Sequence, residues 1–173
     1  MRKAISLGLV VCLVLGVALA GGRPAPIEVV SHYERKCSSC HGKEGSGFDL
    51  NFEKKYSTES DLREMVASMP GAVGMDSQSV EAMVAYMRAL SRGEPFIVWT
   101  RQTAQRLEGE VSSGTQISAT VKRQAVRVER PTPTTWRLTL PEKARPSEVE
   151  LTVRKGGKQV RLSLDRAPYS HTR

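Results

Sequence analysis

The motif Cys37-Ser38-Ser39-Cys40-His41 constrains this chain of 173 residues more than any other feature of its sequence. Two cysteines separated by two residues, with a histidine directly after the second, have the spacing used for covalent attachment of haem. One helical turn presents both thiols to the vinyl groups of a porphyrin, and the adjacent imidazole then reaches the iron. The motif predicts one covalently attached haem c, with thioether bonds to Cys37 and Cys40 and with His41 as the proximal iron ligand.

The first twenty residues are typical of an export signal. Two basic residues precede an apolar stretch over Ile5–Val17, and positions 18 to 20 supply small residues at the spacing of a cleavage site. We therefore predict a signal peptide over residues 1–20 and an exported protein, periplasmic or extracytoplasmic. Its removal would take Cys12 with it and leave only the motif cysteines. The alternative is an uncleaved anchor and a membrane-associated protein, because the apolar run almost reaches the length that spans a bilayer.

Two other uses of a cysteine pair fit the sequence less well. A redox-active dithiol would require a thioredoxin-like βαβ pattern around the motif, and the sequence shows none. A structural zinc ion would require four cysteine or histidine ligands, and the predicted mature chain offers only His32 and His171 besides the motif. His32 also offers a bis-histidine alternative for haem. Its helix should lie on the attachment side of the haem, however, so we expect this side chain to face solvent.

Residues 27–92 resemble a class I c-type cytochrome with a single haem. The resemblance rests on the C-x-x-C-H-G sequence and on the further glycines of the loop, which let backbone pass close to the haem edge. These glycines are Gly42, Gly45 and Gly47. Many members of that family carry a proline shortly afterwards, whereas this chain has Phe48-Asp49-Leu50. The resemblance implies an all-α cytochrome c-like domain, which we place over residues 21–94.

A six-coordinate electron carrier needs a distal iron ligand, and methionine is the side chain to look for. Five methionines follow the predicted signal peptide: Met65, Met69, Met75, Met83 and Met87. In the family that this region resembles, the distal ligand is commonly a methionine followed by proline, which favours Met69 before Pro70. Met75 is the reserve candidate. The other three lie among apolar partners at helical spacing and are expected to be core residues.

Helical periodicity predicts where the helices of this region begin and end. Ser57 or Thr58 should cap the helix that leads to Met69, and Asp76 or Ser77 should cap the last helix. The last helix carries an apolar stripe of Val80, Met83, Val84, Met87 and Leu90. We expect this stripe to pack on three residues of the N-terminal helix, Val29, Val30 and Tyr33.

After Pro95 the apolar residues alternate with polar ones, which is typical of β-strands with one buried face. We predict a second domain over residues 95–168, a small all-β antiparallel sandwich or open barrel of no recognised family, and a disordered tail over 169–173. Lys155-Gly156-Gly157-Lys158 has the sequence of a two-residue hairpin turn. It would pair Val153 with Val160, Leu151 with Leu162 and Val149 with Leu164. The alternation slips between Lys122 and Ala125, which indicates a bulge or a bend.

Charge divides at the same boundary. Residues 21–94 hold 9 lysines and arginines against 11 aspartates and glutamates, whereas residues 95–173 hold 15 against 7. A basic face could be built from Lys122, Arg123, Arg127, Arg137, Arg154 and Arg161. Such a face could steer an acidic partner or contact an anionic membrane surface. The alternative is that outward strand positions are charged simply to keep the protein soluble and to block edge aggregation.

The sequence thus predicts an electron carrier or electron-transfer subunit with no catalytic residues. Its partners would be a redox protein donor and acceptor or a membrane respiratory complex, with no role in binding nucleic acid. The second domain would then be a docking module. Two alternatives stay open: a haem-containing subunit, sensor or enzyme with an exchangeable distal ligand, and a partner-binding β-domain protein in which haem is an accessory.

Overall fold

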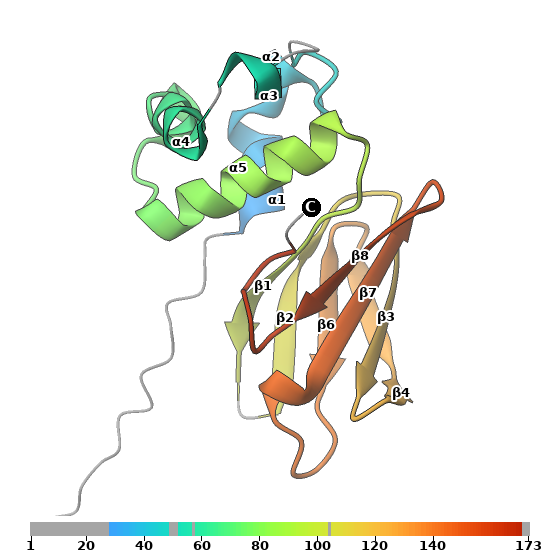
Figure 1. The fold of residues 1–173 in the computed structure, drawn as a ribbon. Coiled ribbons are helices and arrows are strands. Elements are labelled where there is room, and N and C mark those ends of the chain that lie inside the picture. The colour runs from blue at the N-terminus through green and yellow to red at the C-terminus, as the bar shows by residue number, and fades with distance from the viewer. Residues whose placement is uncertain (1–27, 49–51, 57, 104, 171–173) are drawn as a thin grey trace, which may run out of the picture.

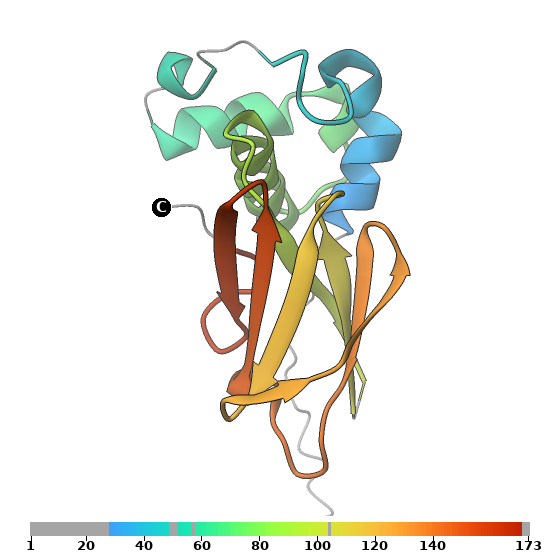
Figure 2. The same cartoon turned by 90° about the vertical axis from the view of Figure 1, so that its right-hand side faces the viewer.

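A computed structural model describes residues 28–48, 52–56, 58–103 and 105–170. A helical region over residues 29–91 is followed by two open four-stranded antiparallel sheets. Figures 1 and 2 show the helices lying across one end of the strands. The predicted signal peptide and the last three residues lie outside the described residues, as does Ser57, one of the two expected caps.

Short helices surround one long helix in the first region. Its elements are α1 (Val29–Lys36), α2 (Ser38–His41), α3 (Phe52–Lys55), α4 (Glu59–Ala67), the 3-10 helix η1 (Pro70–Ala72) and α5 (Ser77–Ser91). The expected packing of α5 on α1 is confirmed, because the three predicted residues of α1 and the stripe of α5 are all buried in one core. Within it the rings of Tyr33 and Tyr86 meet edge to face, 5.3 Å apart. Such an aromatic pair contributes more to stability than the burial of its apolar surface alone would give.

Side-chain caps begin the two longer predicted helices. The Thr58 hydroxyl accepts a hydrogen bond from the Asp61 amide at 3.1 Å, at the start of α4. The Asp76 carboxylate accepts one from the Ser79 amide at 2.7 Å, at the start of α5. Asp76, rather than Ser77, is therefore the cap of α5.

Replacing Asp76 with alanine should lower the free energy of unfolding by about 1 kcal/mol at neutral pH, because α5 loses its cap. The hydrogen bonds from Ser79 hold the pKa of Asp76 below its ordinary value of 3.8. The cap therefore stabilises the protein above pH 3.8, and its contribution is lost as the pH falls through the lowered pKa. Urea unfolding of the two proteins at pH 7 and pH 3 measures this. The matched control is Ser77→Ala, which should cost much less at either pH.

Two sheets follow the helices. Their strands are β1 (Ile97–Gln102), β2 (Arg106–Val111), β3 (Gln116–Val121), β4 (Gln124–Val126), β5 (Val128–Thr132), β6 (Thr135–Thr139), β7 (Val149–Lys155) and β8 (Lys158–Ser163), with the 3-10 helix η2 (Pro146–Glu148) before β7. One sheet has the order β1-β2-β6-β5 and the other β4-β3-β7-β8. Buried side chains of both sheets, such as Leu138 and Leu151, form one core.

The hairpin at Gly156-Gly157 is confirmed. Both glycines have positive φ, and Lys155 pairs with Lys158, Val153 with Val160 and Leu151 with Leu162. The third expected pair, Val149 with Leu164, lies beyond the last pair of this ladder, Glu150 with Ser163.

A bulge or a bend was expected between Lys122 and Ala125; there is no bulge, and the chain bends back on itself. These residues make a two-residue hairpin turn, in which Val121 pairs with Gln124 and both Lys122 and Arg123 have positive φ, at 50° and 69°. Asparagine and glycine usually occupy such positions. The break in the alternation therefore falls at a hairpin turn, which the residue types Lys122 and Arg123 did not indicate.

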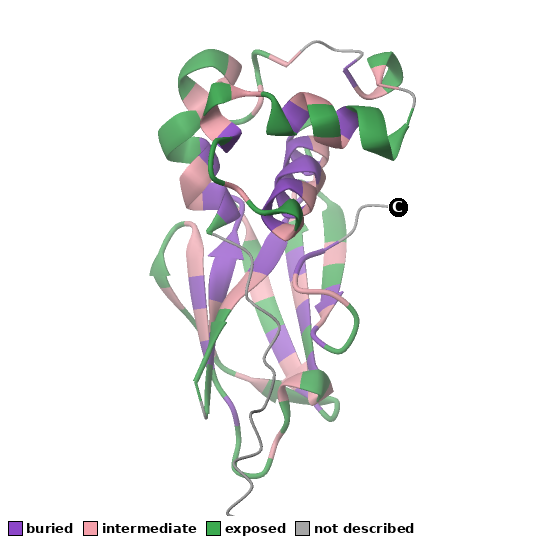
Figure 3. Ribbon diagram, turned by 90° about the vertical axis from the view of Figure 1, so that its left-hand side faces the viewer, coloured by how far each residue is buried: buried purple, intermediate pink, exposed green. Residues whose placement is uncertain are grey.

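The helical region and the sheets share buried contacts. Phe96, Val98 and Tyr169 belong to the same core cluster as the helices. Figure 3 shows buried residues continuing from α1 and α5 into the adjoining ends of the strands. Glu110 of β2 is 2% exposed and accepts hydrogen bonds from the amides of Val30 (2.7 Å) and Ser31 (3.1 Å) and from the Ser31 hydroxyl. This carboxylate from the β region thereby caps the first turn of α1.

The expectation of a disordered tail over residues 169–173 is wrong for its first two residues, Tyr169 and Ser170. Tyr169 forms a β-bridge with Val98, and the Ser170 amide donates to the Ile97 carbonyl oxygen at 2.9 Å. Both residues are buried. Because β1 is an edge strand, this segment pairs with backbone groups that the edge would otherwise leave open. These two residues are ordered by contacts with β1, which is distant in the sequence, so no local sequence pattern predicts them.

Candidate functional site

The two motif cysteines lie one helical turn apart, as predicted. Cys37 ends α1 and caps α2, and its carbonyl oxygen accepts hydrogen bonds from the amides of Cys40 (3.2 Å) and His41 (3.0 Å). Both cysteines are free thiols, Cys37 half-buried and Cys40 exposed. Burial, and next the neighbouring Cys40, raises the pKa of the Cys37 thiol. The turn therefore carries two unoxidised thiols next to His41.

The chain leaves the motif through a tight glycine loop. Gly42 ends α2 with φ of +74°, and a Cβ atom on Gly47 would lie only 2.8 Å from the Cys40 carbonyl oxygen. The Tyr33 hydroxyl donates to the Gly42 carbonyl oxygen at 2.9 Å, which ties the loop back to α1. Burial raises the pKa of Tyr33 to about 12, so this hydroxyl stays a donor. The loop is thus packed against the backbone of Cys40 and His41 and tied to α1.

His41 is part-buried, and its ring lies 5.2 Å from the ring of Phe48. Its Nδ1 atom is buried and has no hydrogen-bond partner among the described residues. An imidazole that binds a metal through one nitrogen commonly donates from the other to an oxygen acceptor. Asp49, in the segment where the resembled family often has proline, lies outside the described residues.

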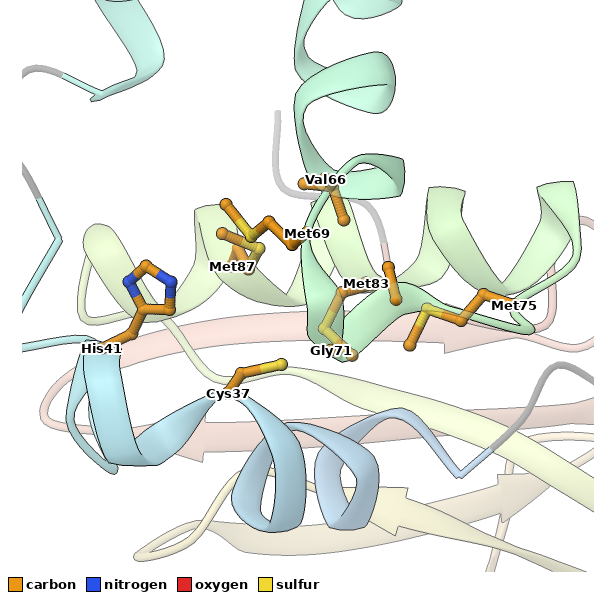
Figure 4. Close-up of a pocket in the computed structure, with 9 residues that line it drawn as sticks. Cys37, His41, Val66, Met69, Gly71, Met75, Met83 and Met87 are labelled. Carbon is orange, nitrogen blue, oxygen red and sulfur yellow. The ribbon is translucent and has the colours of Figure 1, made fainter.

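A narrow cavity, about 10 Å³ of which is open to a water-sized sphere, lies between this turn and the helices that follow. Its wall is made mainly of sulfur and aliphatic carbon, and the site residues in it are Cys37, His41, Met69, Met75, Met83 and Met87. In Figure 4 the His41 ring stands at one end and Met75 at the other, with Met69 and Met87 on the His41 side. The structure therefore brings the predicted proximal residue, one predicted thioether residue and both distal candidates to one cavity. Cys40 is not among the lining residues, although it belongs to the same turn.

The distal candidates differ in their place on the chain. Met69 lies between the end of α4 and η1, with an extended backbone at ψ of 143°, so its side chain has left the helix face as expected. Met69 and Met75 are part-buried, whereas Met83 and Met87 are buried on α5. We expected the latter pair to be core residues, and they are. They also line the cavity, a role that their i, i+4 spacing on one helix face could have suggested.

The expectation that His32 faces solvent is wrong. The ring is part-buried, and its Nε2 atom lies 2.6 Å from the carbonyl oxygen of Gly71. The sequence offered no sign of this contact, because the two residues lie 39 positions apart. His32 is not among the residues that line the cavity, so in this arrangement it does not take part in the bis-histidine alternative.

The six basic residues proposed for one face are divided between the two sheets. Arg137 belongs to the sheet of β1 and β2, and Arg154 and Arg161 belong to the sheet of β7 and β8. Three of the six lie beside glutamates: Arg137 with Glu108 at 3.0 Å, Lys122 with Glu148 at 3.2 Å and Arg161 with Glu150 at 3.7 Å. This arrangement favours charged outward strand positions over one continuous basic face.

No known protein family, curated protein or solved structure matches this chain. Within the described residues, none of the helices combines the length and the apolar character needed to cross a bilayer. The function of the cavity is therefore inferred from its own side chains.

Proposed function

We propose that this chain is an exported monohaem c-type cytochrome that transfers single electrons between redox partners. Haem c would be bound through Cys37 and Cys40, with His41 as the proximal ligand and Met69 as the distal ligand. The helical region would be a cytochrome c-like domain, and the two sheets a small sandwich that serves as the docking module. The observation that carries the proposal is the pair of free thiols one helical turn apart, next to an imidazole that faces a methionine-lined cavity.

The donor set fits this group. Two thiols can form two thioethers, an imidazole and a thioether are a known axial pair, and the surrounding wall is apolar. When bound, the haem supplies an iron centre that gains or loses one electron. The thioether of Met69 would stabilise the reduced iron relative to a second imidazole, and the buried Met83 and Met87 would keep water from the site. Both effects favour a high reduction potential.

The volume of the cavity indicates which side chains must move on loading. Only about 10 Å³ of it is open to a water-sized sphere, far below the roughly 300–1,000 Å³ of ordinary ligand pockets. Met69 and Met75 are part-buried, flexible side chains at the ends of a short segment, whereas Met83 and Met87 are held in the core. We therefore expect the side chains of Met69 and Met75 to move on loading while α5 stays in place.

The test is covalent haem in protein matured by a host with a haem-attachment system. Intact mass should show the polypeptide from Gly21 plus one haem, and a pyridine haemochrome spectrum should show two thioether bonds. The double variant Cys37→Ala/Cys40→Ala should carry no covalent haem, because no thiol remains to form either bond. Wild-type protein of unmodified mass from such a host would refute the proposal.

Carbon monoxide distinguishes the carrier from a sensor or enzyme with an exchangeable distal ligand. A methionine that stays on the iron should keep the ferrous protein slow to bind carbon monoxide and give the ferric protein a methionine-to-iron charge-transfer band. Rapid binding together with the absence of that band would favour the exchangeable site instead.

A further inference from the structure

His32 joins the helix that carries the cysteines to the segment that carries Met69. Its Nε2 atom lies 2.6 Å from the carbonyl oxygen of Gly71, two residues after Met69 in η1. His32 itself lies on α1, five residues before Cys37. It lines a surface groove with Val73, on the flank of the same segment whose Gly71 faces the cavity. This contact therefore joins α1, at whose end Cys37 lines the cavity, to the segment that carries Met69.

The segment is also packed directly on the end of α1. A Cβ atom on Gly71 would lie 3.1 Å from the Sγ atom of Cys37 and 3.4 Å from the Lys36 carbonyl oxygen. Figure 4 shows Gly71 beside Cys37 at the edge of the cavity. Because glycine lets the backbone approach this closely, the carbonyl of Gly71 comes within reach of His32.

We propose that His32 is a positioning residue that holds the Met69 segment against α1. By doing so it determines how persistently the Met69 thioether occupies the distal side of the site. The ligand part of this inference rests on the proposed function, whereas the attachment of the segment to α1 does not depend on haem.

The first test measures the segment itself, by hydrogen exchange at the Ala72 and Met75 amides. These amides donate to the carbonyl oxygens of Met69 (2.9 Å) and Ala72 (3.0 Å), so they exchange when the segment opens. In His32→Leu we expect exchange about two- to tenfold faster, the change in open population that loss of one ordinary hydrogen bond produces. His32→Gln retains an N–H donor and should exchange nearly as wild type. Arg35→Leu, at an exposed position that lines the same groove, is the matched control and should not change the rates.

The second test measures the effect on Met69 in haem-loaded protein. His32→Leu should weaken the methionine-to-iron charge-transfer band on mild warming and bind carbon monoxide about two- to tenfold faster, and His32→Gln should restore both. Wild-type exchange rates in His32→Leu would overturn the attachment role whether or not haem is bound. Faster exchange with an unchanged band and carbon monoxide rate would overturn the positioning of Met69. Loaded wild-type protein that lacks the band would instead refute Met69 ligation in the proposed function and leave the exchange result to stand.

Discussion

On the proposed function, replacing Met69 with alanine should open the distal side of the bound haem. While methionine is the ligand, carbon monoxide can bind only to the fraction of molecules, about 0.1–10%, in which the methionine has left the iron. Removing the methionine should therefore raise the apparent affinity for carbon monoxide about 10- to 1,000-fold. The methionine-to-iron charge-transfer band should vanish, and the reduction potential should fall. Titration of the ferrous protein with carbon monoxide, together with a spectrum of the ferric protein, measures these effects.

Met75→Ala is the matched control, because Met75 is a part-buried methionine of the same cavity at its other end. It should retain the band and the slow carbon monoxide reaction. If Met75→Ala loses the band while Met69→Ala retains it, the reserve candidate is the ligand. Met83 and Met87 are less suited to this comparison, since truncating either buried side chain would destabilise the core as well.

Replacing Glu110 with alanine should lower the free energy of unfolding by about 3 kcal/mol at pH 7. The change leaves the amides of Val30 and Ser31 without their acceptor at the buried start of α1. Each buried donor that loses its partner costs about 1–3 kcal/mol. Thermal and urea unfolding, followed separately by the tryptophans of the β region and by helical circular dichroism, should show both regions losing stability together.

Glu108→Ala is the control for that change, because Glu108 lies two residues earlier on the same strand and pairs with Arg137 near the surface. Its loss should cost less than about 1 kcal/mol. Equal effects of the two substitutions would contradict the capping role of Glu110. So would a loss of stability confined to the β region.

The pH dependence of Glu110 has the opposite sign to that of Asp76. Burial raises the pKa of Glu110 above its ordinary 4.5, against the lowering effect of its hydrogen bonds from Ser31 and Val30. The folded protein therefore holds this proton more tightly than the unfolded chain does. The stability of the wild type relative to Glu110→Gln should be greatest below pH 4.5 and should fall as the pH rises through the raised pKa.

Features set by neighbouring residues were predicted well from sequence. The turn that presents Cys37 and Cys40, the caps Thr58 and Asp76, and the glycine hairpin all depend on side chains and dihedral angles within a few positions. Met69 left its helix at the predicted place because Pro70 follows it. The Lys122-Arg123 turn was missed because its positive φ angles are imposed by strand pairing on residues that do not prefer them.

The sequence by itself determined which chemical groups are available, namely two thiols and an imidazole on one turn and a methionine before a proline. It also determined the change from helices to strands near Pro95. Only the tertiary structure decided how these parts are held. It placed Glu110 at the start of α1, 80 positions away from Val30, and His32 against Gly71. It also aligned Met83 and Met87 with the cavity. Such contacts form between residues that chain folding brings together, and a buried carboxylate or histidine finds its partner in space rather than along the sequence.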